Sequence, residues 1–240
     1  MKPGETKLAD TRGRFLQALR NGRERSDAGW TNGRILLSNK RIVLAGTSGK
    51  RTFPLSKIEQ VGGRFDVNQR VATVADYIAL QFDDGEDVIL VAPAEFEEFE
   101  MDLYDALLSS TKFLVRHPAV EGGVVQNTEW ERAKMQVETE AVNIATVAGT
   151  FVGVQLDDIG DIEMGRRTVR EERREVIEVE HSDDNGTSVQ TYISGPERAV
   201  GILKSLLRIG EEQTETALDL SRQDKQVLMA LYSGVSPFDI

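Results

Sequence analysis

The chain of 240 residues contains no cysteine and only two histidines, His117 and His181. The lack of cysteine excludes disulfides, thiolate metal sites and cysteine nucleophiles. Two histidines, one in a predicted linker and one near a predicted turn, leave little for a zinc site or a histidine-based triad. No apolar run approaches the length of about 18 residues that a spanning helix needs, and the chain does not begin with a signal-like segment. We therefore expect a soluble cytoplasmic protein that is not an enzyme and holds no metal or cofactor.

Aromatic residues make up only 6% of the chain, and its only two tryptophans, Trp30 and Trp130, are followed by similar patterns. A Leu-x-x-Ile-x-x-(Val/Ile) step recurs at an offset of 101 residues, at Leu55/Leu156, Ile58/Ile159 and Val61/Ile162. An internal repeat constrains the architecture more than any other feature. The sequence thus predicts two copies of one small domain, and the length suffices for two domains of about 100 residues.

The first copy is predicted to be a β domain closed by a helix. Alternating apolar runs and turn residues predict seven strands, over 34–37, 41–45, 51–54, 55–61, 71–74, 77–82 and 88–91. Asp83-Asp84-Gly85 between the last two strands is typical of a hairpin turn rather than a calcium loop. An apolar stripe predicts a helix over 94–108. This order is typical of a PH-like or GRAM-like barrel over residues 30–116.

The second copy, over 129–209, follows the same plan after a linker at 117–128. Its strands are expected at 134–138, 142–146, 151–155, 161–164, 169–180 and 188–193, with a hairpin turn at 183–186 and a closing helix over 197–207. The predicted fold class is therefore mainly β (α+β), with two tandem PH-like β-barrel or sandwich domains. Residues 210–240 are expected to form a polar linker and an incomplete helix-turn-helix or winged-helix start, with Ser221 as a helix cap.

Charge is unevenly divided along the chain. Residues 1–70 carry 15 Lys/Arg against 6 Asp/Glu, whereas residues 71–240 carry 14 against 34. Residues 1–29 form a basic lead-in segment, in which the helical spacing of Phe15, Leu16 and Leu19 predicts a short helix. The asymmetry favours a basic face and an acidic body that contact different partners, although a merely solvated surface gives the same counts. The mixed-sign run at 166–175 predicts a self-paired surface rather than a nucleic-acid patch.

Two segments resemble a known family. The ending Leu228–Ile240 (LMALYSGVSPFDI) and the segment Gly33–Leu44 (GRILLSNKRIVL) are similar to the archaeal taxis adaptor family CheF. The resemblance implies a non-enzymatic, dimeric adaptor at the cytoplasmic face of the archaellum motor. It further implies that the adaptor connects the phosphorylated response regulator CheY to the motor switch complex and associates with CheC and CheD. CheY binding is implied for the C-terminal tail, and this chain ends early in that region.

Combining the resemblance with the charge pattern gives two candidate surfaces. The basic residues expected to face the motor complex are Arg12, Arg14, Arg20, Arg23, Arg25, Lys40 and Arg41. The apolar residues expected to face the response regulator are Leu228, Leu231, Tyr232, Val235 and Phe238.

Two other functions remain open from the sequence. A lipid-binding PH/GRAM module would use the region of Arg34, Lys40 and Arg41. A transcriptional regulator would need a basic recognition helix, but residues 209–240 hold only Arg222 and Lys225 against six carboxylates.

Overall fold

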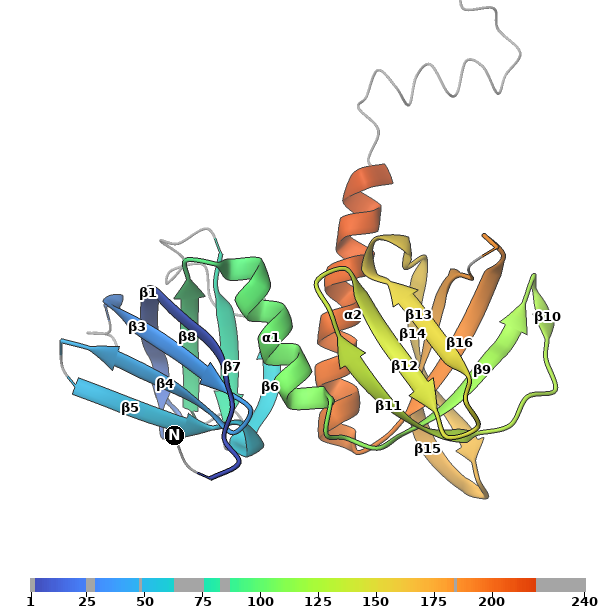
Figure 1. Ribbon diagram of the computed structural model, residues 1–240, viewed down its shortest axis with the longest axis horizontal. Helices are drawn as coiled ribbons and strands as arrows, with labels where there is room; N and C mark the ends of the chain where they lie inside the picture. Colours follow the sequence, from blue (N-terminus) through green and yellow to red (C-terminus); the bar gives the residue numbers. More distant parts are fainter. Residues whose placement is uncertain are drawn as a thin grey trace, which may run out of the picture.

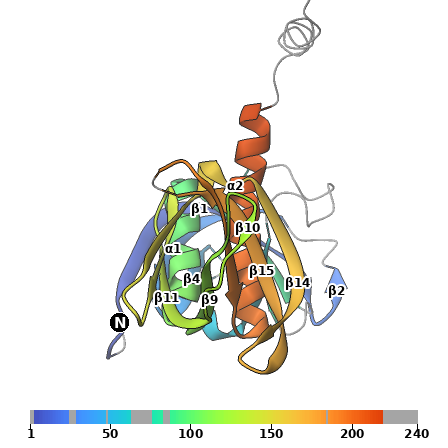
Figure 2. The same cartoon turned by 90° about the vertical axis from the view of Figure 1, so that its right-hand side faces the viewer.

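The computed structural model describes residues 3–24, 29–47, 49–62, 76–82, 87–183 and 185–218. Over these residues the protein has two sheets and two α-helices, and it is mainly β, as the sequence predicts. In Figure 1 the sheets lie on either side of the two helices, which run next to each other. The C-terminal end of the second helix projects beyond both sheets in Figure 1 and in the turned view of Figure 2.

The first sheet has the strand order β5-β4-β3-β1-β8-β7-β6, with β2 paired to β1. All of its pairs are antiparallel. Its elements are β1 (Lys7–Arg20), β2 (Arg23–Glu24), β3 (Thr31–Ser38), β4 (Arg41–Gly46), β5 (Gly49–Pro54), the 3-10 turn η1 (Leu55–Lys57), β6 (Ile58–Gly62), β7 (Ile78–Phe82), β8 (Asp87–Pro93) and the helix α1 (Phe96–Leu108).

The second sheet has the strand order β13-β12-β11-β9-β16-β15-β14, with β10 paired to β9. Its elements are β9 (Phe113–Glu121), β10 (Val124–Val125), β11 (Glu131–Val137), β12 (Ala141–Thr146), β13 (Phe151–Gln155), the 3-10 turn η3 (Leu156–Asp158), β14 (Asp161–Val169), β15 (Glu172–Ser182), β16 (Ser188–Ser194) and the helix α2 (Glu197–Leu218).

The two units have the same topology, which confirms the predicted duplication. Each strand of the first sheet has a counterpart at the same place in the second, and each unit has a 3-10 turn after its fifth strand and a helix after its last. The residues after the two 3-10 turns, Ile58 and Ile159, share φ −75° and ψ 116°. Both isoleucines are buried, as are Leu55 and Leu156 at the start of the turns. The 101-residue step therefore marks equivalent core positions.

The helix predicted in the basic lead-in segment is wrong, because residues 7–20 form β1. This strand pairs with β3 and β8 near the middle of the first sheet. Phe15 lies in the main core, whereas the next residue, Leu16, packs in a second apolar cluster. Successive side chains of a strand point to opposite faces of the sheet. Phe15 and Leu16 follow one another because both faces of β1 are covered at this point, and this imitates helical spacing.

The predicted linkers also need correction. Residues 117–128 contain most of β9, a strand that pairs with β11 and β16, together with β10. The Gly122-Gly123 pair, with φ of 52° and 80°, makes the turn between β9 and β10 rather than a domain boundary. The predicted linker at 210–216 is part of α2, which continues to Leu218. Gly210 is buried there, and a Cβ on it would lie 2.4 Å from the carbonyl oxygen of Leu156.

The remaining strand predictions are mostly confirmed within a few residues, but the strand expected over 55–61 is wrong in its first three residues, which form the 3-10 turn η1. The strand expected over 169–180 begins only at Glu172, because Arg170 and Glu171 adopt positive φ and turn the chain between β14 and β15. The predicted hairpins are confirmed by antiparallel pairing of β7 with β8 and of β15 with β16. The turn residues 83–85 and the strand expected over 71–74 lie outside the described residues.

The two units pack against each other through their closing helices. Their buried apolar residues form one continuous cluster that includes Leu103 of α1 and Leu203 of α2. Polar contacts cross the interface in both directions. The carboxylate of Asp105 on α1 accepts a hydrogen bond from the Val137 N–H of the second sheet, 3.0 Å away. The guanidinium of Arg198 on α2 donates to two backbone carbonyls of the first unit. Helix packing and hydrogen bonding therefore hold the units in one arrangement.

Candidate partner-binding surfaces

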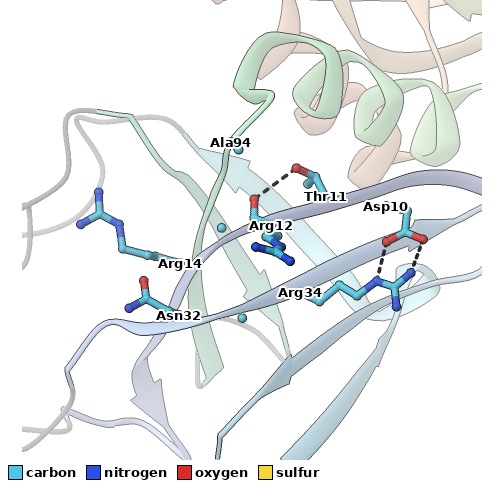
Figure 3. A pocket seen from close by; sticks show the side chains of 9 residues that line it. Asp10, Thr11, Arg12, Arg14, Asn32, Arg34 and Ala94 are labelled. Atoms are coloured by element: carbon cyan, nitrogen blue, oxygen red, sulfur yellow. Dashed lines mark hydrogen bonds and ion pairs between the residues drawn. The ribbon is translucent and has the colours of Figure 1, made fainter.

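Arg12 and Arg14 occupy alternate positions on β1 and are both exposed. They line an open cavity of about 890 Å³ on the first sheet, together with residues of β3 and the chain after β8 (Asp10, Thr11, Gly13, Asn32, Gly33, Arg34 and Ala94). Figure 3 shows their guanidinium groups extending from β1. Gly13 and Gly33 are cross-strand partners, and a Cβ on Gly13 would lie 2.4 Å from the Ala92 carbonyl oxygen. The glycines thus allow the strands to approach closely beneath this surface.

The charges at this cavity are not equivalent. Arg34 forms a bidentate ion pair with Asp10, with both N–O distances at 2.6 Å. The hydrogen bond from Arg34 lowers the pKa of Asp10 to about 2, so this carboxylate stays charged and balances the guanidinium. Among the described residues neither Arg12 nor Arg14 has an ion-pair partner. These two arginines supply the uncompensated positive charge of the surface.

The other basic candidates do not join them. Arg41 forms a bidentate ion pair with Glu5, and the Lys40 ammonium donates to the carbonyl of Pro3, 3.0 Å away. Lys40 and Arg41 lie near the start of β1, because they closely follow Ser38, which pairs with Lys7. Arg20 and Arg23 are cross-strand partners at the other end of β1, roughly 40 Å away at about 3.3 Å per residue. Arg25 lies outside the described residues. The predicted basic set is therefore divided along the strand, with Arg12 and Arg14 in its middle.

A second apolar cluster lies on β1, β7 and β8 next to these arginines. It contains Leu16, Tyr77, Ala79, Val88, Leu90 and Ala92, with Ala18, Leu19 and Trp30 packed against it. The Trp30 ring lies 6.3 Å from that of Tyr77 between centroids. Trp30 is half-buried, as is Trp130 in a small cluster of the second unit. The two tryptophans therefore border apolar clusters and remain partly accessible.

Three arginines on β14 and β15 of the second unit are paired with carboxylates. Arg167 forms a bidentate pair with Glu178, and its guanidinium also lies 4.5 Å from the centroid of the Tyr192 ring. Arg174 pairs with Glu172, and Arg166 lies 3.8 Å from a Glu175 oxygen. The prediction of a self-paired surface over 166–175 is confirmed for Arg166 and Arg174, whose carboxylate partners lie within this run.

The two histidines lie together, which the sequence did not reveal. The Thr191 hydroxyl lies 2.8 Å from Nδ1 of His117 and 2.8 Å from Nε2 of His181, and the rings stack with centroids 6.0 Å apart. Burial, followed by the neighbouring His181, lowers the pKa of His117 to about 4, and burial also lowers the pKa of His181. Both rings are therefore neutral at pH 7. Within the described residues there is no group of three potential metal ligands.

One buried acid was also missed. Glu100 on α1 is 8% exposed, and burial, then the charges of Asp76 and Glu97, raises its pKa to about 7. The sequence alone does not distinguish Glu100 from an ordinary solvated glutamate on a helix.

Within the part of the chain that the structure describes, no helix combines the length and apolar character required to cross a bilayer.

The apolar residues expected to contact a response regulator are in the C-terminal tail. Leu228, Leu231, Tyr232, Val235 and Phe238 all lie outside the described residues, as does the predicted cap Ser221. The chain enters this segment from the projecting end of α2.

Comparison with known proteins identifies a family across both units. Residues 7–213 match the family described as Archaeal Chemotaxis signal transduction system protein F, and residues 219–240 match a separate domain of unknown function. The chain is 47% identical over 241 residues to Taxis protein CheF1 of Halobacterium salinarum, covering 100% of this chain and 83% of that protein. It is 24% identical over 215 residues to Taxis protein CheF2 of the same organism, covering 84% of this chain and 72% of that protein.

Structural comparison adds only a weak likeness. The C-terminal domain of an unknown protein from Leishmania infantum aligns with a TM-score of 0.32 and 12% identity, covering 44% of this chain and 86% of that domain. The family match over both units agrees with the 47% identity to Taxis protein CheF1. The chain therefore belongs to the archaeal chemotaxis signal transduction protein F family and has a role in taxis signalling.

Proposed function

We propose that this protein is a non-enzymatic adaptor that links the phosphorylated response regulator CheY to the switch complex of the archaellum motor. It would act as a homodimer in the cytoplasm, with CheC and CheD as further partners. The observation that carries the proposal is the family match over residues 7–213, which spans both units and the helices between them. An adaptor needs partner surfaces held at a fixed separation, and helices packed between two sheets supply such a body. Each unit, with an eight-stranded antiparallel sheet and a closing helix, is proposed to be a PH-like barrel.

The motor-facing surface is proposed to centre on Arg12 and Arg14. Their charges are not offset by a described carboxylate, and the partly accessible Trp30 cluster lies beside them. Arginine and tryptophan are enriched among residues that dominate binding energy at protein interfaces. An acidic partner surface with an apolar centre would complement this arrangement.

A pull-down of motor proteins tests this surface. The double variant Arg12→Glu/Arg14→Glu should reduce capture at least tenfold, because electrostatic attraction becomes repulsion. The matched control is Arg132→Glu/Lys134→Glu, which reverses two exposed cations at alternate positions on β11 of the second unit. Equal capture by the two variants would show that the first unit's charge does not matter.

The response-regulator surface is proposed to be the tail around Leu228, Leu231 and Tyr232. Residues 219–240 match a different family description from the two-unit body, which supports a separate binding module. Deleting residues 219–240 leaves α2 intact and should abolish heat release in a calorimetric titration with CheY carrying a phosphoryl mimic. Undiminished binding by the truncated chain would place the response regulator elsewhere.

Lipid binding through Arg34, Lys40 and Arg41 is less well supported. Arg34 and Arg41 are each engaged by a carboxylate in bidentate geometry, and Lys40 is bound to a backbone carbonyl. A lipid headgroup would have to displace these partners. Co-sedimentation with anionic liposomes should therefore leave the protein in the supernatant.

A further inference from the structure

The duplicated units differ at one equivalent place, the β5 end of the first sheet and the β13 end of the second. β5 ends the first sheet and β13 ends the second, and among the described strands each pairs only with its preceding neighbour, β4 or β12. The offset of 101 residues places Phe151, Gly153 and Gln155 at the positions of Lys50, Thr52 and Pro54. The first unit therefore serves as an internal reference for the second.

The hydrogen-bond pattern shows which backbone groups of β13 face outward. The Leu156 N–H donates to the Glu140 carbonyl at 2.8 Å, and the Thr146 N–H donates to the Thr150 carbonyl at 2.9 Å. Hydrogen-bonded pairs alternate along an antiparallel ladder, so residues 152 and 154 bond to β12. The N–H and C=O groups that point away from the sheet belong to Phe151, Gly153 and Gln155. By the same alternation from the Leu55–Lys40 bond, those of β5 belong to Lys50, Thr52 and Pro54.

The two edges carry opposite features. Lysine and proline are the residues with which proteins block edge pairing, because a charge resists desolvation and proline lacks the N–H donor. β5 has both at its outward positions, Lys50 and Pro54. β13 has neither, and its five residues (FVGVQ) contain no charge. The Phe151 side chain is 69% exposed and Gly153 adds no side chain to obstruct an approaching strand. One copy of the fold has a protected edge and the other an open edge.

We propose that β13 pairs antiparallel with β13 of a second copy of this chain, about a twofold axis at Gly153. Gly153 then faces Gly153 of the partner subunit, and Phe151 faces Gln155 of the partner subunit. These three positions use all their outward N–H and C=O groups, giving up to six hydrogen bonds. No charge in the strand opposes its own copy, although the chain carries a net charge of −11. The space above the paired glycines receives the two phenylalanine rings.

The protected β5 edge explains why β13 pairs with its own copy rather than with β5 of another chain. A strand edge that also accepted β13 would produce a head-to-tail contact that repeats without closing. Lys50 and Pro54 prevent it, so the symmetric β13 pair is the closed solution. This inference specifies the homodimer of the proposed function, but it does not depend on CheY or motor binding, and its tests use the purified chain alone.

Sedimentation velocity over a concentration series measures the dimer. The wild-type chain of 26.6 kDa should sediment as a species of twice that mass. Gln155 has φ −72°, close to the −64° of Pro54, so Gln155→Pro removes the outward donor without straining the backbone. The variant Phe151→Lys/Gln155→Pro copies the β5 edge onto β13 and should raise the dimer dissociation constant at least 100-fold. Thr52→Lys, the matched change on β5, should leave it unchanged.

A site-specific cross-link locates the interface. The chain has no cysteine, so Gly153→Cys creates a unique thiol, and a Cβ there meets no atom nearer than 3.7 Å. Paired Cα atoms at this position would lie about 5.5 Å apart. A short bis-maleimide should therefore convert Gly153→Cys to a covalent dimer and leave Thr52→Cys as a monomer. A monomeric wild type, a dimer that survives the β13 double substitution, or equal cross-linking of the two cysteine variants would each overturn the proposal.

Discussion

Replacing Arg198 by alanine should uncouple the two units. The Arg198 guanidinium on α2 donates to the backbone carbonyls of Ile58 and Leu55 in the first unit, the latter at 2.7 Å. Both acceptor residues are buried, at 0% and 4% exposure. The Leu55 carbonyl also accepts a hydrogen bond from the Ile58 N–H, so it keeps a partner in the variant. The main loss in the variant is the charged guanidinium that donates to the carbonyls of Leu55 and Ile58, just before and at the start of β6.

The magnitude follows from these contacts. A hydrogen bond to a charged group contributes about 1.5–3 kcal/mol, and the partial exposure of Arg198 lets water replace part of it. We expect the Arg198→Ala variant to lose about 2–4 kcal/mol of interface free energy. With a urea dependence of about 3 kcal/mol per M, the unfolding midpoint of the less stable unit should fall by about 1 M. The matched control is Arg208→Ala, an exposed arginine on the same helix with the same change in helix propensity.

Each unit contains one tryptophan, so each can be followed separately by fluorescence. Trp130→Phe leaves Trp30 to report the first unit, and Trp30→Phe leaves Trp130 to report the second. In the wild-type background both reporters should give the same urea midpoint, because the units share one core. In the Arg198→Ala background the two midpoints should separate. Coincident midpoints equal to those of Arg208→Ala would refute the coupling through Arg198.

Two further predictions concern His117 and a pair of glycines. The unfolded chain protonates His117 near pH 6.5, whereas the folded protein does so only at about 4, so the free energy of unfolding should fall as pH drops through this window. After a discount for partial exposure of His117, the free energy of unfolding should fall by about 1–2 kcal/mol. The urea midpoints at pH 7 and pH 4.5 should therefore differ less for the His117→Gln variant than for the wild-type chain. Gly13→Val should destabilise the protein by about 3 kcal/mol because the new Cβ meets the Ala92 carbonyl oxygen at 2.4 Å. Gly201→Ala, in open space on exposed helix, should stabilise it by about 0.5–1 kcal/mol; thermal unfolding of both variants gives the comparison, and equal effects would contradict it.

The sequence was informative where burial is one-sided. The repeated Leu-x-x-Ile step predicted equivalent positions because Leu55, Ile58 and their counterparts Leu156 and Ile159 lie in the core of both units. The sequence misled at β1 because this strand is covered on both faces at Phe15 and Leu16, which removes the alternation that identifies strands. The linker predicted over 117–128 is wrong because a hairpin turn, here Gly122 and Gly123, has the same local composition as a linker.

The candidate surfaces needed the structure for a different reason. Arg12, Arg34 and Arg41 have the same residue type, but only the fold brings Asp10 to Arg34 and Glu5 to Arg41. Distances along the chain of 24 and 36 residues separate these partners, so the compensation of charge was not visible in the sequence. The open β13 edge likewise required the strand order and the alternation of hydrogen bonds. The composition of residues 151–155 alone describes any buried strand.

The adaptor function is tested most directly by a bridging assay with purified components. CheY carrying a phosphoryl mimic is immobilised and motor switch proteins are applied with and without this chain. Motor proteins should be retained only when the chain is present, and retention should be lost with Arg12→Glu/Arg14→Glu and with deletion of residues 219–240. Retention that needs no chain, or a chain that binds only one partner at a time, would contradict the proposed link.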